Sequence, residues 1–177
     1  MNAYCNSLNF NVYPLNGGIT LNPHPTHIRK LNLSLINPAL TYIFDSLGVK
    51  VVSLQHLSYP PYFTGTIHID NEGGDYIKLN WIFNGFGSTV NWYKPISDIK
   101  KNKCIAGNEY VCIKYDSSEV ELLYSHQVIL PSLIQVGIPH NIINYSEPRE
   151  CLSMVLCLNG KRITMSESIE LFKNYIV

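Results

Sequence analysis

The sequence lacks net charge, long apolar runs and a secretion signal, and each absence excludes a class of protein. Thirteen basic residues balance thirteen acidic ones, so no overall field attracts nucleic acid or an acidic membrane surface. No stretch reaches the length of a membrane-spanning helix, and the N-terminus has neither a basic nor an apolar signal region. We therefore expect a soluble, cytoplasmic protein whose partners are neither nucleic acid nor membrane.

Cysteine is also sparse. The five cysteines form neither a CxxC pair nor a dense disulfide framework, which indicates a reducing compartment. Of the 177 residues, 46% are hydrophobic and only 15% are charged, so the chain is long and apolar enough for one domain with a substantial core. Twelve tyrosines and two tryptophans favour β-structure.

The chain divides into three parts of one domain, residues 1–177. Residues 1–49 form an N-terminal segment with one helix, because Asn37 can cap it, Pro38 suits its first position and Gly48 can end it. Residues 159–177 contain a second short helix, opened by the capping box Thr164 to Glu167. Between them, residues 50–158 alternate short β-rich runs with Gly, Pro, Asn and Asp. These runs cover residues 51–57, 65–70, 78–84, 88–94, 110–115, 120–125, 133–138, 141–145 and 149–158.

The absence of helices between these runs favours a mainly β fold, a two-sheet jelly roll with one or two short flanking helices. On the run 65–70, His68 and Asp70 are two residues apart and so point to the same face. A second histidine, His140, lies far downstream. Two histidines and one carboxylate with open positions beside them are the ligand set of non-haem Fe(II) oxygenases. We predict that these three residues bind a metal and form the catalytic centre.

Arg149 and Ser153 follow His140 and share one face of the run 149–158. Arg149 is one of three arginines, and it begins an apolar strand. A buried guanidinium requires an anion, and its geometry matches a carboxylate. The hydroxyl of Ser153 can donate a further hydrogen bond to such an anion. These residues predict a carboxylate site near the metal.

The order His-x-Asp, a distal His, an Arg about ten residues later and then a Ser resembles the Fe(II)/2-oxoglutarate-dependent oxygenases. The segment 78–93, KLNWIFNGFGSTVNWY, is similar to the second strand pair of small, often phage- or bacterium-encoded members. The match covers roughly residues 62 to 158. It implies a double-stranded β-helix in which His68, Asp70 and His140 hold Fe(II), and a host-cell cytoplasm as the site of action if the chain is virus-encoded.

The resemblance also implies the cosubstrates and the reaction. 2-Oxoglutarate would chelate the iron while Arg149 and Ser153 hold its C5 carboxylate, and O2 would complete the site. The pocket would be lined by Asn80, which could hydrogen-bond the cosubstrate, by Tyr62, and by Trp92 on the substrate side. The implied reaction is hydroxylation of an acceptor with release of succinate and CO2. The acceptor would be a peptide Pro, Asn or Asp side chain, or a small molecule.

Two other functions remain open at this point. The chain could be a jelly-roll binding or structural module in which the three metal-ligand candidates never converge. It could also be a cupin-like metalloenzyme that needs no 2-oxoglutarate. For single residues, His140 could be an ordinary turn residue, and Arg149 could form a surface pair with Glu147 or Glu150. The acceptor and the oligomeric state are not specified by the sequence.

Overall fold

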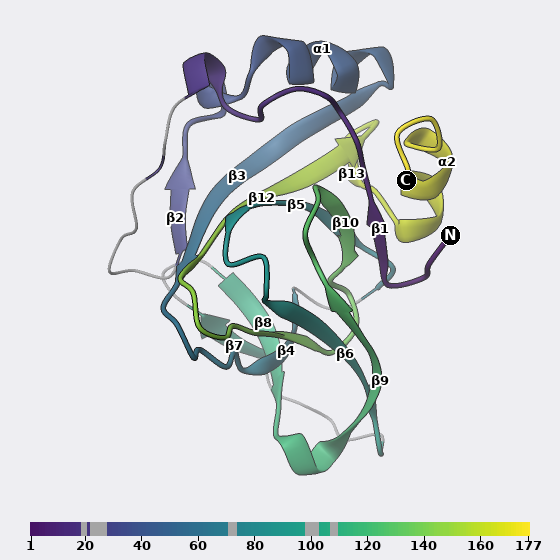
Figure 1. The fold of residues 1–177 in the computed structure, drawn as a ribbon. Coiled ribbons are helices and arrows are strands. Elements are labelled where there is room, and N and C mark those ends of the chain that lie inside the picture. Colours follow the sequence, from purple (N-terminus) through teal and green to yellow (C-terminus); the bar gives the residue numbers. More distant parts are fainter. Residues whose placement is uncertain (19–20, 22–27, 71–73, 98–102, 107–109) are drawn as a thin grey trace.

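The computed structural model describes residues 1–18, 21, 28–70, 74–97, 103–106 and 110–177. Two antiparallel sheets face each other (Figure 1). The larger contains, in spatial order, β1 (Cys5–Ser7), β10 (Ser132–Gln135), β5 (Ile77–Asn84), β12 (Arg149–Leu158), β3 (Val49–Tyr59) and β2 (Ile28–Leu31), with β13 (Lys161–Arg162) beside β12. The smaller contains β7 (Lys103–Ala106), β8 (Tyr110–Tyr115), β4 (Ile67–Asp70), β11 (His140–Ile143), β6 (Thr89–Pro95) and β9 (Val120–Gln127).

This arrangement confirms the predicted mainly β jelly roll. Every β-rich run expected from the sequence overlaps a strand, and β12 has the expected bounds. The sequence did not predict β7, which pairs with β8 at the edge of the smaller sheet. β1 and β2, from the N-terminal segment, are the two edges of the larger sheet.

Both predicted helices are present. α1 (Pro38–Ser46) begins where the side chain of Asn37 accepts a hydrogen bond from the Ala39 backbone, and the chain turns away at Gly48 with φ of 70°. α2 (Met165–Leu171) opens with the expected capping box between Thr164 and Glu167. Three short 3-10 turns, Asn16–Gly18, Leu33–Leu35 and Ser117–Glu119, join other elements. Among the described residues, no helix is long and apolar enough to cross a membrane.

Alternate side chains of the larger sheet enter two different layers. The outer layer packs against α1 and α2 and contains Leu40, Phe44, Leu54, Leu79, Leu152, Met154, Met165 and Phe172. The inner layer lies between the sheets and contains Leu57, Ile82, Val90, Trp92, Ile134, Val136 and Cys151. The polar side chains of the site lie beside this inner layer.

Candidate metal centre

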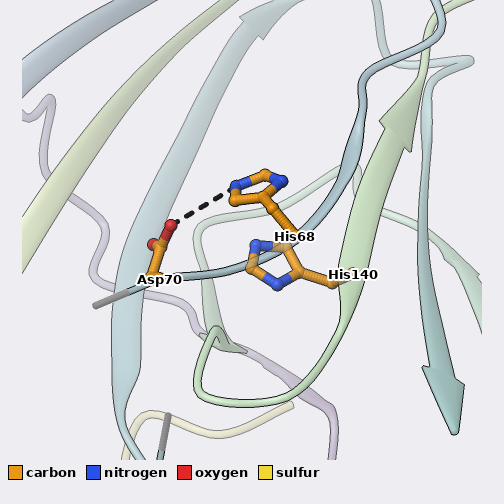
Figure 2. A group of neighbouring side chains, drawn as sticks. All are labelled: His68, Asp70 and His140. Atoms are coloured by element: carbon orange, nitrogen blue, oxygen red, sulfur yellow. Dashed lines mark ion pairs between the residues drawn. The ribbon is translucent and has the colours of Figure 1, made fainter. Parts of the chain in front are cut away.

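The structure brings the three predicted metal ligands together. His68 and Asp70 lie on β4, and His140 lies on the neighbouring strand β11, directly opposite His68 in the register (Figure 2). One ligand atom from each side chain can be chosen so that all three atoms lie within 4.8 Å of one another. The side chain of His68 is 32% exposed and that of Asp70 only 3%, so the cluster has a solvent side and a buried side.

Both imidazole rings are oriented by the backbone. Nδ1 of His68 lies 2.8 Å from the carbonyl oxygen of Thr66, and Nδ1 of His140 lies 2.9 Å from that of Ile138. A neutral ring that donates from Nδ1 has its lone pair on Nε2. Nε2 of His68 lies 3.3 Å from Oδ1 of Asp70, so a lone pair would face a carboxylate oxygen. A shared cation removes that repulsion, and these residues therefore fit a metal ion.

Asp70 is held in its ionised form. Burial raises the pKa of this carboxyl, but the ammonium of Lys78 and the neighbouring imidazoles of His68 and His140 outweigh it and hold the pKa well below its usual range. Nζ of Lys78 lies 2.7 Å from Oδ2 of Asp70, and both side chains are at most 9% exposed. One carboxylate oxygen is thus bound to Lys78 while the other faces the histidines, as a metal ligand must be.

His140 is held in its neutral form. Burial and the neighbouring charge of His68 lower the pKa of His140 to about 4, although Asp70 acts in the opposite direction. A neutral imidazole is the form that binds a metal. At neutral pH, Asp70 and His140 are therefore already in the protonation states that bind a metal.

The cluster lines a cavity of about 250 Å³ between the two sheets. The part of its wall on the larger sheet includes the polar residues Gln55, Lys78, Asn80 and Ser153. Other parts of the wall are apolar and include Leu57, Val90 and Val136. Such a cavity can hold one small polar molecule beside the three metal-ligand candidates.

The other predicted site residues divide into two groups. Asn80 and Ser153 line the cavity, as expected. Trp92 does not line it: the ring is fully buried in the inner core, where Nε1 donates to the carbonyl oxygen of Gln135 at 2.8 Å. Tyr62 does not line it either, because it lies in a turn with φ of 58° and is 81% exposed. The geometry thus gives no support to a substrate role for either aromatic residue.

Arg149 is buried but lies outside the cavity wall. It is fully shielded from solvent, so it forms no surface ion pair. Its Nε donates to Oγ of Ser88 at 3.0 Å, and its Cζ lies 6.0 Å from the centre of the Tyr59 ring. Both Nη atoms have no hydrogen-bond partner among the described residues. Ser153 is four residues further along β12, about 13 Å at 3.3 Å per residue, so the two do not meet at one point of the wall.

Lys78 contacts Asp70 and lines the cavity, but the sequence analysis did not single it out. The sequence pattern could have indicated it, because Lys78 and Asn80 are two residues apart on one predicted strand and therefore share a face. A lysine at the start of a strand is ordinarily solvent-exposed, which hides it as a candidate for a buried site.

Comparisons with known proteins give likeness of overall fold only. No family model matches the chain, and no curated protein matches it. Solved structures that resemble it include "Oxalate oxidase in complex with substrate analogue glycolate", with 15% identity and a TM-score of 0.38, over 85% of this chain and 64% of that one. "Recombinant oxalate oxidase in complex with glycolate" has 13% identity and a TM-score of 0.37, over 87% of this chain and 77% of that one. The chain thus spans less than two thirds of the first structure.

Proposed function

We propose that the protein is a mononuclear metalloenzyme, an Fe(II)- and 2-oxoglutarate-dependent dioxygenase that hydroxylates an acceptor. The observation that carries this proposal is the convergence of His68, Asp70 and His140 on the wall of a cavity between the two sheets. Three protein ligands leave further coordination positions for small molecules. Iron bound there would supply the position at which a 2-oxo acid chelates and dioxygen is activated.

In the proposed reaction one oxygen atom enters an acceptor C–H bond to give C–OH, and the other enters 2-oxoglutarate as it loses CO2 and becomes succinate. The chain would contribute binding, orientation and exclusion of water. The backbone carbonyls at Thr66 and Ile138 fix the two imidazoles, and the buried ammonium of Lys78 adds positive charge beside the site. The apolar walls keep bulk water from the reacting atoms.

The acceptor is proposed to be a peptide side chain or a small molecule that approaches from the solvent side. This side is marked by His68, which is partly exposed, and by Lys114, which lies opposite it on β8 and lines the cavity. A cavity of about 250 Å³ favours an acceptor that inserts only one small group. The lack of net charge argues against a nucleic acid.

The test is anaerobic titration of the purified protein with Fe(II) and then with 2-oxoglutarate, followed by succinate measurement after admission of air. We expect wild type to bind both and to release succinate. His68→Ala should lose metal binding, whereas His126→Ala, which changes a histidine outside the cavity, should behave as wild type. The proposal fails if metal-loaded wild type binds no 2-oxoglutarate.

A second candidate is a metalloenzyme of the same fold that oxidises or cleaves a small acid without 2-oxoglutarate. The position of Arg149 favours it, because the residue expected to hold the cosubstrate is absent from the cavity wall. Measurement of oxygen uptake with small mono- and dicarboxylic acids, in the presence and absence of 2-oxoglutarate, separates the two. The third alternative, a binding module without a metal site, loses its premise because the three ligands converge.

A further inference from the structure

A row of polar residues crosses the inner face of the larger sheet. The register pairs Ser132 of β10 with Asn80 of β5, Asn80 with Ser153 of β12, and Ser153 with Gln55 of β3. Residues directly opposite one another in a sheet share a face, so these four side chains form one continuous line. The next row consists of Ile82, Cys151 and Leu57 and is apolar.

One buried polar atom of this row has no hydrogen-bond partner among the described residues. Asn80 is only 6% exposed, and its Oδ1 atom is buried without a partner among the described residues. A buried amide group without its hydrogen bond costs about 1–3 kcal/mol. Ser153 is only 2% exposed, and it lines the cavity together with Asn80 and Gln55. Because Oδ1 and a carboxylate both accept hydrogen bonds, a carboxylate would be bound by Nδ2 of Asn80 after rotation of the amide about its last bond.

Lys78 connects this row to the metal ligands. It lies two residues before Asn80 on the same face of β5, and it lines the same cavity. Its ammonium holds Asp70 at 2.7 Å, but an ammonium has three donors and can also donate to a ligand oxygen. A buried positive charge, an amide and a hydroxyl together are the complement of a carboxylate.

We propose that Lys78, Asn80, Ser153 and Gln55 bind the distal carboxylate of a small dicarboxylic acid whose other end faces His68, Asp70 and His140. This inference rests on the proposed function, in which that acid is 2-oxoglutarate. The anion would then be bound by this polar row, beside the three metal-ligand candidates, and not by Arg149. A cavity of about 250 Å³ suits one short acid.

The experiment compares two ligands that differ only at the distal end. Protein loaded anaerobically with Fe(II) is titrated by calorimetry with 2-oxoglutarate and with 2-oxopentanoate, in which a methyl group replaces the distal carboxylate. We expect wild type to prefer 2-oxoglutarate by about tenfold to hundredfold, the value of a hydrogen bond to a charged group. Lys78→Met and Asn80→Leu should lose most of this preference, and Arg149→Met should keep it.

Fe(II) titration of each variant shows whether its metal site is intact, which matters because Lys78 contacts Asp70. If Lys78→Met binds iron poorly, Asn80→Leu alone decides the result. The inference is overturned if both variants keep the preference, or if Arg149→Met alone abolishes it. If wild type binds no 2-oxoglutarate, the proposed function fails separately, and glutarate against pentanoate provides the same comparison. Absence of any preference for a dicarboxylate then overturns the inference as well.

Discussion

Along one row of three strands in the larger sheet, neighbouring residues on the two faces have opposite chemistry, although the outer face also holds the buried pair His56–Glu150. On the outer face, Leu54, Leu79 and Leu152 are fully buried against the two helices. The next residue on each strand points inward, and these residues are Gln55, Asn80 and Ser153. All three inward residues line the cavity.

Within the same three strands, the outer face contributes to stability and the inner face is the candidate for binding. Apolar area removed from water stabilises the fold by about 25 cal/mol per Å², so the outer face contributes stability directly. The inner row buries polar atoms, and the Oδ1 of Asn80 is not satisfied by any described residue. The inner face is therefore the part of the sheet at which we propose that a ligand binds.

The largest expected effect is on the outer face. Leu152→Ala should lower the free energy of unfolding by about 2–5 kcal/mol, because it opens a cavity in a close-packed layer. Urea unfolding measures the change, and calorimetry on the folded variant should give wild-type affinity for Fe(II) and 2-oxoglutarate. Ser153→Ala is the matched control on the inner face: we expect less than about 1 kcal/mol in stability and a weaker affinity for 2-oxoglutarate. Equal effects of both changes on ligand affinity would remove the distinction between the faces.

A second prediction concerns the dependence of stability on pH, because His140 and Asp70 line the cavity and their pKa values are shifted. The pKa of His140 is about 4 in the folded protein and 6.5 in its ordinary range. Between these values the unfolded chain binds a proton that the folded chain does not. The metal-free protein should therefore lose about 3 kcal/mol of stability as the pH falls from about 6.5 to about 4. Asp70 adds a further loss of stability below about pH 4. The pKa of Asp70 is lower in the folded protein than in the unfolded chain, so the stability that Asp70 contributes is complete above the unfolded pKa and is lost as the pH falls below it.

Urea unfolding at several pH values measures this dependence. His140→Gln removes the titrating ring while keeping a polar side chain, and it should flatten the curve between about pH 4 and 6.5. An unchanged slope would mean that His140 is not held neutral in the folded protein. Leu152→Ala, opposite the buried pair His56–Glu150, should lower the whole curve while His140 keeps its own contribution to the slope.

Much of the site could be predicted from the sequence because strand periodicity is strict. The two-residue spacing of His68 and Asp70 requires a common face, and the jelly-roll topology brings β11 beside β4, so His140 arrives opposite His68. The two helices were predictable from local capping chemistry at Asn37 and Thr164. These features depend on neighbours in the chain or on a fold that fixes strand order.

The anion site was harder, because periodicity gives the face of a residue but not its position along the strand relative to the metal. Arg149 and Ser153 do share a face, but four residues separate them, and only Ser153 reaches the cavity. The position of Lys78 depends on how far β5 is shifted against β12 and β10, and short-range patterns do not encode that register.

The smallest expected effect has the opposite sign to the first. Asn80→Leu replaces a buried amide that lacks a hydrogen bond with an apolar group of similar shape, so it should stabilise the metal-free protein by about 1 kcal/mol. The same change should weaken 2-oxoglutarate binding, because the row loses its amide. Leu79→Asn, one residue earlier on the outer face, is the mirror control and should destabilise the protein, since it buries an amide in an apolar layer. Thermal unfolding of the two variants, with and without 2-oxoglutarate, measures both changes in stability and the effect of the ligand. If Asn80→Leu destabilises the metal-free protein, Asn80 is a structural residue and the two faces differ less than their chemistry indicates.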